Sequence, residues 1–292
     1  MSTASDVTPE GAFNIRAQAE RAASAAARRS GVTVRELVDM EDLREMSALL
    51  ESVWGRSAEG VPVHSEMLRS LVHAGGCVTG AYDAIGRLVG GAALTIAAPA
   101  GSTYSLIAAA SPNSGDKGIG QAVKLRQRAW ALERDYTSMV WTFDPLVSRN
   151  ARFNLVKLGA SVTAYEVAFY GRMSDEINGD DEADRLVATW QLDARRAIAA
   201  SEGTGQEVVA PGEDAEPLAD GPDGKPMLRR DSSGLWCRVP WDVVALRRSD
   251  PGRASRWRVA VREVFTRAIA EGGTATHMTR DGWYLLTTEE PE

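Results

Sequence analysis

Hydrophobic and polar residues change their spacing along the chain, and the spacing predicts an order of helices and strands. Short apolar runs bounded by Gly, Pro, Asn or Asp are typical of strands, whereas apolar residues three and four positions apart are typical of helices. We expect helices over 13–29, 41–53, 65–74, 121–134 and 148–158. We also expect a helix from Pro251 to near Gly272, with Asp250 as its N-cap. We expect strands over 32–37, 77–82, 88–97, 103–110, 138–143, 161–170, 185–192 and 235–239, and a hairpin of 274–279 with 283–288.

This order of elements predicts the α/β class, with a mixed sheet flanked by helices and a small C-terminal α+β module over 231–292. A hairpin of 77–82 with 88–97, with Gly86 in its turn, comes first, and a strand–helix–strand unit follows within 32–195, which favours a sheet covered on both faces. The interval 196–230 is predicted as an acidic linker, because 201–227 holds seven acidic residues against one lysine. Residues 1–31 are expected to form an N-terminal helical arm, which is either a homodimer contact or a loosely attached surface helix.

Composition narrows the class of protein further. Hydrophobic residues at 44% and charged residues at 25% are ordinary for a globular chain of 292 residues. The net charge of -7 argues against a nucleic-acid partner, because phosphate contacts need a concentrated basic surface. No run approaches the roughly 18 apolar residues of a membrane helix and no signal sequence begins the chain, so we expect a cytoplasmic protein without a membrane partner.

The same composition offers no metal centre. Cys77 and Cys237 lie far apart without the spacing of a zinc or redox motif, and we expect both in the core. The three histidines are dispersed, so the sequence predicts no metal site.

The most informative segment is 111–124, with the sequence SPNSGDKGIGQAVK, between a predicted strand and a predicted helix. Unpaired amides and the dipole at a helix start can bind a phosphate, and glycine lets a large anion approach closely. A P-loop is excluded because Gln121 and Ala122 follow Gly120, and a dinucleotide fingerprint is excluded because Val123 stands where it needs Gly or Ala. An ordinary helix-start turn is the alternative interpretation.

This segment resembles the acyl-CoA pyrophosphate loop of the GNAT superfamily, whose pattern is Arg or Gln, two residues, Gly, one residue, then Gly or Ala. Gly118 and Gly120 occupy the glycine positions, whereas Gly115 stands at the usual arginine position and Lys117 supplies a nearby positive charge. The resemblance implies acetyl-CoA or another acyl-CoA as co-substrate. The cofactor-binding residues that it implies are Ala108, Ala110, Gly115, Lys117, Gly118, Ile119, Gly120, Gln121 and Asn150.

A second segment, 141–160 with the sequence WTFDPLVSRNARFNLVKLGA, resembles a GNAT subfamily of predicted acetyltransferases. That subfamily has Thr-Phe-Asp-Pro-Leu at a strand end and Arg-Asn and Lys-Leu-Gly-Ala on the next helix. The resemblance continues through RMSDEING at 172–179 and through VPWDVVALRRSDP and RWRVAVREVF near the C-terminus. It implies that the pantetheine arm lies between the strands ending near Ala110 and Phe143, with Asn150 in contact; helix capping is the alternative role of Asn150.

The resemblance implies an N-acyltransferase that moves an acetyl or similar acyl group to a small-molecule amine, an amino acid being one candidate. Such a reaction uses a base for the amine, an oxyanion donor and an acid for the thiolate. Leu155 stands where the superfamily commonly has the tyrosine acid, and 103–110 contains no carboxylate. The catalytic candidates are Asp144, for amine binding or water-mediated proton removal, and Tyr104; a turn before a proline is the other interpretation of Asp144.

Two questions about function stay open at this stage. Trp141, Phe143 and His64 are candidates for the acceptor pocket, although aromatic residues at strand ends are commonly core. The rival functions are a CoA-binding protein without transferase activity and a different CoA-thioester reaction on the same fold, such as decarboxylation or hydrolysis.

Overall fold

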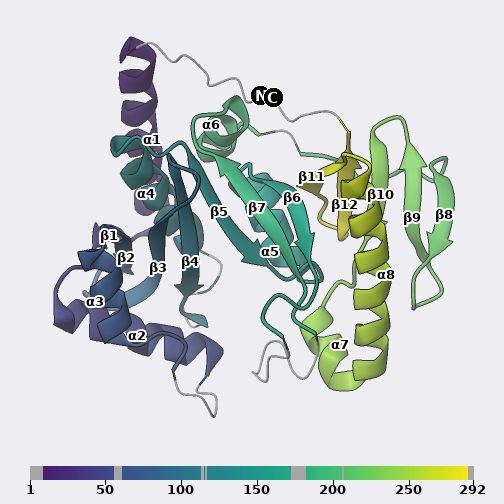
Figure 1. Cartoon of the computed structure of the whole chain (residues 1–292), viewed down its shortest axis with the longest axis horizontal. Helices are drawn as coiled ribbons and strands as arrows, with labels where there is room; N and C mark the ends of the chain where they lie inside the picture. The colour runs from purple at the N-terminus through teal and green to yellow at the C-terminus, as the bar shows by residue number, and fades with distance from the viewer. Residues whose placement is uncertain are drawn as a thin grey trace. The chain divides into compact units, whose positions relative to one another are not determined.

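A computed structural model describes residues 9–55, 61–112, 115, 117–171, 182–205 and 207–288 (Figure 1). The RMSDEING motif at 172–179 lies outside the described residues. The chain divides into two compact units. Unit 1 takes the described residues of Met1–Val53, Val63–Met139 and Gln191–Ala194, and unit 2 takes those of Trp54–Pro62, Val140–Trp190 and Arg195–Glu292. This division differs from the predicted boundaries after residues 31, 195 and 230.

Unit 1 is an antiparallel sheet with helices on its two faces. Its helices are α1 (Pro9–Ser30), α2 (Met40–Trp54), α3 (Ser65–His73) and α4 (Ile119–Glu133). Its strands follow the order β1 (Thr33–Glu36), β2 (Cys77–Tyr82), β3 (Leu88–Ala97) and β4 (Ser102–Ala110), and each neighbouring pair is antiparallel. The predicted hairpin of 77–82 with 88–97 is confirmed.

Two consecutive glycines of β3 show which helix covers which face. A Cβ atom added at Gly90 would lie 2.5 Å from the Ile119 side chain of α4, and one added at Gly91 would lie 2.5 Å from Met46 Sδ of α2. Successive strand residues face opposite sides of a sheet, so α4 and α2 cover opposite faces. The missing side chains allow both helices to lie close to the strand.

The structure corrects the prediction of an N-terminal arm, because α1 packs along α4 within unit 1 (Figure 1). Its inward stripe consists of alanines three and four positions apart, which bring two helices close together. The buried members are Ala19, Ala22, Ala23 and Ala26. Nearby, Arg128 Nη1 of α4 donates a hydrogen bond of 2.8 Å to Gln18 Oε1 of α1.

Unit 2 holds a longer sheet. The strands follow the order β5 (Ser138–Phe143), β7 (Arg185–Gln191), β6 (Ser161–Glu166), β11 (Thr274–Met278), β12 (Trp283–Thr287), β10 (Gly234–Arg238), β9 (Pro226–Asp231) and β8 (Glu216–Asp220). The helices are α5 (Ser148–Arg152), which continues into a π-helical turn at Phe153–Lys157, α6 (Arg195–Glu202), α7 (Val243–Ser249) and α8 (Pro251–Ala270). From β7 to β8 each neighbouring pair is antiparallel.

The predicted acidic linker at 196–230 contains regular structure, and this corrects the prediction. Within it lie most of α6, all of β8 and most of β9. Val208 and Ala210, from the same interval, pack against a core cluster of Trp236, Trp283 and Leu285. Every residue of β8 is exposed, so its side chains show no alternation from which a strand could be predicted.

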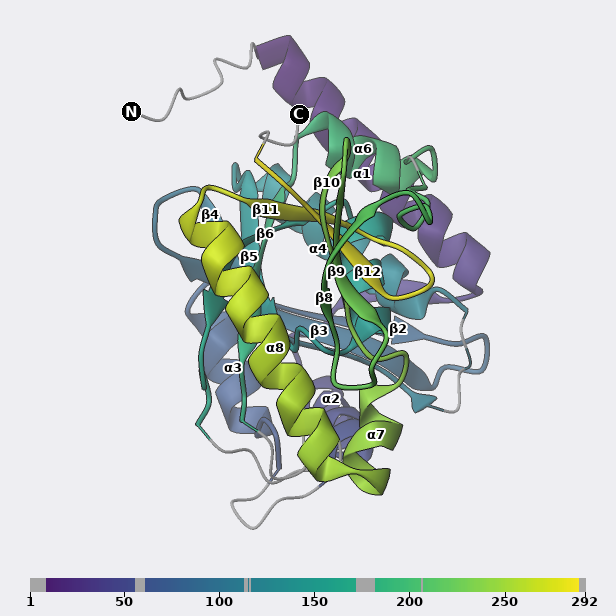
Figure 2. The same cartoon turned by 90° about the vertical axis from the view of Figure 1, so that its right-hand side faces the viewer.

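The C-terminal module also differs from its prediction, because its strands extend the sheet of β6 and β7. Ala275 of β11 pairs with Val162 of β6 in antiparallel register. Helix α8 packs beside these strands (Figure 2), and the ring of Phe265 lies 6.1 Å from Tyr165 and 5.0 Å from Tyr284. The predicted start of this helix is confirmed, since Asp250 caps it by accepting a hydrogen bond from the Arg253 amide.

Candidate functional site

The segment between β4 and α4 leads directly into a helix start that lacks a side-chain cap. Gly118 is the N-cap residue of α4, with φ 77°, and has no side chain with which to cap the helix. The first hydrogen bond within α4 runs from the Ala122 amide to the Gly118 carbonyl, at 3.1 Å. The amides of Ile119 and Gly120 precede it, at positions where an α-helix offers no carbonyl acceptor. They form a group of donors at the positive end of the helix dipole.

The positive φ angles explain two of the three glycines. Gly115 has φ 67° and Gly118 has φ 77°, a left-handed region that other residues adopt with strain. A Cβ atom at Gly118 would also lie 3.2 Å from Ser30 Oγ. Gly120 lies inside α4, where any residue could form the helix, so its backbone conformation does not require glycine.

Hydrophobic packing fixes the position of this helix start. Ile119 is 4% exposed and belongs to a core cluster with Ala81, Ala92 and Val123. Its side chain therefore points into the sheet, and only its backbone can contribute to a ligand site. Gln121 is half-buried and Lys117 is exposed.

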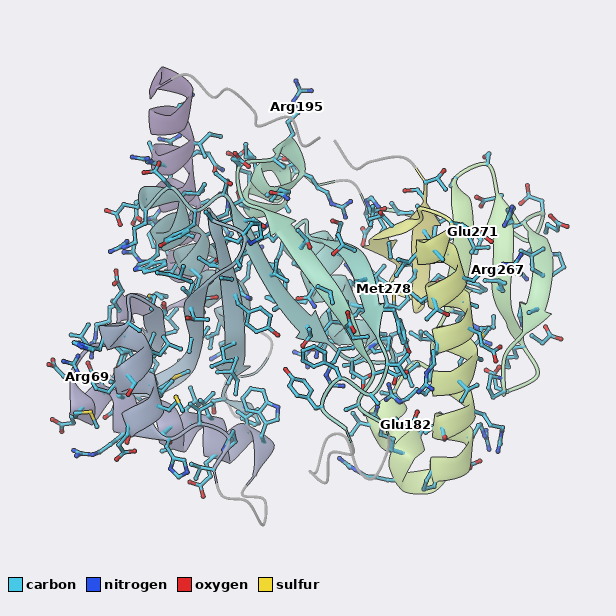
Figure 3. All side chains as sticks on the ribbon, in the orientation of Figure 1. Arg69, Glu182, Arg195, Arg267, Glu271 and Met278 are labelled. Carbon is cyan, nitrogen blue, oxygen red and sulfur yellow. The ribbon has the colours of Figure 1, made fainter. Side chains whose placement is uncertain are left out.

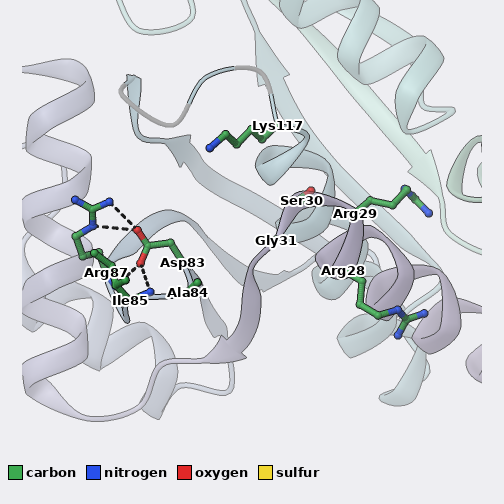
Figure 4. A pocket seen from close by; sticks show the side chains of 9 residues that line it. All are labelled: Arg28, Arg29, Ser30, Gly31, Asp83, Ala84, Ile85, Arg87 and Lys117. Atoms are coloured by element: carbon green, nitrogen blue, oxygen red, sulfur yellow. Dashed lines mark hydrogen bonds and ion pairs between the residues drawn. The ribbon is translucent and has the colours of Figure 1, made fainter.

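Beside this segment lies a cavity of about 730 Å³ with a basic lining (Figure 4). The lining residues come from the end of α1, the β2–β3 turn and the approach to α4, and they are Arg28, Arg29, Ser30, Gly31, Asp83, Ala84, Ile85, Arg87 and Lys117. The lining holds three arginines and one lysine but a single aspartate, although the whole chain carries a net charge of -7. This basic cavity was not predicted, because its residues come from three segments that lie far apart in the sequence.

Strand β4 ends in small side chains next to the segment that leads into α4. Ala108 is exposed and Ala110 is half-buried, and Ala110 pairs with Gly90 of β3. Tyr104, nearer the start of β4, is half-buried and pairs with Thr95. The Ser111 amide continues the pairing by donating to the Val89 carbonyl at 2.8 Å.

A buried lysine of α4 lies behind β4. Lys124 is 3% exposed and its Nζ donates a hydrogen bond of 2.7 Å to Ser105 Oγ, which in turn donates to Gln127 Oε1 at 3.3 Å. Burial lowers the pKa of Lys124 to about 7. Arg128 of the same helix is also buried and donates from Nε to the Leu192 carbonyl at 2.7 Å.

In unit 2, the carboxylate of Asp144 lies in a buried ion-pair cluster. Arg247 Nη2 of α7 lies 2.6 Å and Arg258 Nη2 of α8 lies 3.2 Å from Asp144 Oδ2, and Oδ1 accepts from the Leu146 amide at 2.9 Å. Burial by itself would raise the pKa of Asp144, but the charges of Arg258 and Arg247 hold it below its ordinary value. A carboxylate with a lowered pKa and these partners is a weak base, and its contacts instead connect the end of β5 to α7 and α8.

The other candidates of unit 2 divide between core and surface. Trp141 and Phe143 are both 6% exposed, and Trp141 packs edge-on against Trp190 with ring centroids 6.1 Å apart. This burial favours the core interpretation of both aromatic residues. Asn150 is exposed on α5, whose N-cap residue is Val147, so the structure does not assign Asn150 the capping role.

His64, the remaining substrate candidate, lies in unit 1. It is the exposed N-cap residue of α3, and its side chain does not cap the helix. The structure places it on a different unit from Trp141 and Phe143. Among the described residues, no three His, Cys, Asp or Glu side chains gather in a way that could hold a metal ion. In the part of the chain that the structure describes, no helix has the length and apolarity needed to cross a membrane.

The fold belongs to the α/β class, and the prediction of an α/β fold with helices flanking a sheet is confirmed. No family model matches the sequence, and no curated protein matches it significantly. Solved structures to which the chain is similar include GNAT-family and other acetyltransferases.

Three solved structures illustrate this similarity, and each aligns with 55% of this chain. An N-acetyltransferase from Staphylococcus aureus is 13% identical over 98% of its own length, with a TM-score of 0.46. A GNAT superfamily phosphinothricin acetyltransferase from Sinorhizobium meliloti, in complex with AcCoA, is 20% identical over 87% of its length, with a TM-score of 0.45. The ribosomal-protein-S18-alanine N-acetyltransferase from Escherichia coli is 12% identical over 94% of its length, with a TM-score of 0.45. At such low identities and TM-scores, the chemistry of this chain must be argued from its own residues.

Proposed function

We propose that this chain is an acyl-CoA-dependent N-acyltransferase of the GNAT superfamily, which transfers an acetyl or similar acyl group to a small-molecule amine. The observation that carries the proposal is the start of α4. Gly118 caps the helix without a side chain, the amides of Ile119 and Gly120 begin the first turn, where an α-helix offers no carbonyl acceptor, and exposed Lys117 precedes them. A backbone anion site of this kind suits the pyrophosphate of CoA.

The chain's own residues suggest how the reaction is supported. The amine nitrogen attacks the thioester carbonyl carbon and loses a proton to water, the carbon–sulfur bond breaks, and the departing thiolate takes up a proton. Leu155 is 1% exposed in the core and supplies no acid, and Asp144 is held by two guanidinium groups. Tyr104 is the one tyrosine on β4, which carries no carboxylate or histidine. We therefore propose that a water molecule delivers the proton to the thiolate. Tyr104 remains the candidate catalytic side chain on β4.

Titration calorimetry with acetyl-CoA tests the cofactor assignment. We expect wild type to bind at micromolar concentration and Gly118→Asp to bind at least about 100-fold more weakly, because the new carboxylate would occupy the helix-start amides and repel the pyrophosphate. Gly252→Asp is the matched control, since it adds the same charge to the first turn of α8, where a Cβ atom has only ordinary contacts. Undiminished affinity in Gly118→Asp, or no heat from wild type with millimolar acetyl-CoA, would refute the assignment.

A CoA-binding protein without transferase activity is the second candidate, and the burial of Leu155 together with the ion pairs of Asp144 favours it. Release of free thiol from acetyl-CoA over a panel of amines distinguishes the two. Amine-dependent thiol release with an acylated amine in the mass spectrum establishes the transferase. Tight binding without thiol release establishes the binding protein, and thiol release without any amine indicates a different thioester reaction.

A further inference from the structure

We propose that the basic cavity beside the α4 start binds the ribose 3′-phosphate end of CoA, so that helix α1 forms part of the nucleotide site. This inference rests on the proposed function and goes beyond it, because it assigns a ligand group to residues outside the pyrophosphate segment. Its starting point is Lys117, which lines the cavity and directly precedes the N-cap residue Gly118. Figure 4 shows the Lys117 side chain extending across the space between the β2–β3 turn and Ser30–Gly31.

The β2–β3 turn holds one arginine ready at the rim of the cavity. Asp83 Oδ2 accepts a hydrogen bond of 2.9 Å from Arg87 Nε and also pairs with Nη2 at 2.9 Å. Asp83 Oδ1 accepts from the Ile85 and Arg87 amides at 3.1 and 2.9 Å, which fixes the carboxylate to its own turn. A guanidinium has five N–H donors, so these contacts orient Arg87 and leave it donors for a phosphate.

The opposite side of the cavity is fixed by the way in which α1 ends. Gly31 has φ 65°, its amide donates to the Arg28 carbonyl and the Val32 amide donates to the Ala27 carbonyl, each at 3.1 Å. These paired bonds form a Schellman motif, which fixes the direction in which the chain leaves the helix. The two hydrogen bonds also give partners to the Arg28 and Ala27 carbonyl oxygens, whose partial negative charge would otherwise weaken an anion site.

Arg28 and Arg29 add exposed positive charge on this side. In Figure 4 both side chains extend away from Lys117, and exposed side chains change rotamer within nanoseconds, so both guanidinium groups can turn toward a ligand. Even without such a turn, their charges contribute to the electrostatic field at the cavity, because salt screens a charge only beyond about one Debye length.

The size of the cavity and its position beside the start of α4 identify the ligand group. A cavity of about 730 Å³ is far larger than one phosphate and falls in the usual range for small-molecule sites. CoA carries a pyrophosphate and, one ribose away, a separate 3′-phosphate. A ligand whose pyrophosphate lies at the start of α4 therefore has a second phosphate that can reach the positive charges of Lys117, Arg87 and the α1 end.

The test compares CoA with 3′-dephospho-CoA, which lacks only the phosphate in question. By titration calorimetry we expect wild type to prefer CoA by about 30-fold, a size typical of charge-assisted hydrogen bonds. In the double variant Arg28→Ala/Arg29→Ala, and separately in Arg87→Gln, we expect this preference to fall to about 5-fold while affinity for 3′-dephospho-CoA changes by less than about 2-fold. Arg21→Ala is the matched control, because Arg21 is an exposed arginine on α1 outside the cavity.

The outcomes separate this inference from the proposed function. If wild type binds both nucleotides equally tightly, the inference is wrong and the proposed function stands. If the arginine variants weaken both nucleotides by the same factor, these side chains contact the pyrophosphate instead, which overturns the assignment to the 3′-phosphate. If wild type binds neither nucleotide, the proposed function fails and this inference fails with it. Circular dichroism of each variant shows that the helices are intact.

Discussion

Lys124 shows how a residue can reverse its expected environment. In the sequence it lies on the charged side of an apolar helical stripe, yet in the structure it is 3% exposed and donates to Ser105. The helical pattern identifies one apolar stripe, but α4 packs on the sheet with one side and on α1 with another, and the second contact could not be read from the helix itself. The same cause buries Arg128.

The burial of Lys124 predicts a pH dependence of stability. Because its pKa falls to about 7 in the folded protein and returns to about 10.4 on unfolding, the unfolded chain binds an extra proton between these values. The free energy of unfolding should therefore rise with pH, by about 1 kcal/mol per unit between pH 7.5 and 9.5. Replacing the lysine in Lys124→Met should remove this rise.

Urea unfolding of wild type and Lys124→Met at several pH values measures the difference directly. Lys157→Met is a control, because Lys157 is an exposed lysine of unit 2. Parallel pH profiles for wild type and Lys124→Met would show that Lys124 keeps its proton in the folded state and would contradict the prediction.

At the level of elements, the contacts of Asp144 predict a structural role at the junction of β5, α7 and α8. Asp144→Asn removes the charge that balances Arg247 and Arg258, and a buried pair broken on one side typically costs about 3–5 kcal/mol. We expect the free energy of unfolding to fall by that amount in urea titrations. Glu166→Gln, an exposed carboxylate on β6, should stay within about 0.5 kcal/mol of wild type.

The same variant tests the catalytic interpretation of Asp144. Unchanged stability combined with a large loss of turnover would restore Asp144 as the base and contradict the structural role.

Exposed ion pairs offer a contrast to the buried pairs of Asp144, since Arg267 and Glu271 near the end of α8 (Figure 3) lie 3.0 Å apart with both side chains in solvent. Such a pair contributes about 0.5 kcal/mol or less.

Elements with strong local signals could be predicted, and elements defined by distant partners could not. The start of α8 follows from Asp250 and Pro251, and the β2–β3 hairpin follows from a turn with Gly86 between apolar runs. In contrast, α7 is short and every residue of β8 is exposed, so neither element has a clear pattern in the sequence. Both are held by contacts with residues that lie far away in the sequence. The helix-start glycines of the candidate site were predictable for the same local reason, whereas the basic cavity required the fold.

For the whole molecule, the packing of α1 predicts that unit 1 depends on the first 31 residues. Removing these residues exposes the face of α4 against which the buried alanines of α1 pack. It also removes the hydrogen bond between Arg128 and Gln18. We expect the truncated chain to unfold at least about 10 °C lower in a thermal scan by circular dichroism, because several kcal/mol of packing are lost. Arg21→Ala, which leaves the packing intact, should unfold within about 2 °C of wild type. A truncated chain as stable as wild type would return α1 to the role of a loosely attached helix.

The exposed strand β8 has a consequence for how copies of this protein meet. As the last strand in the order of its sheet it presents backbone donors and acceptors along one side, which is the usual route by which sheets join edge to edge and aggregate. Pro217 lacks an amide proton, and the acidic ends Glu216 and Asp220 would repel an identical strand. The acidity that made this segment resemble a linker thus protects the sheet from adding another chain.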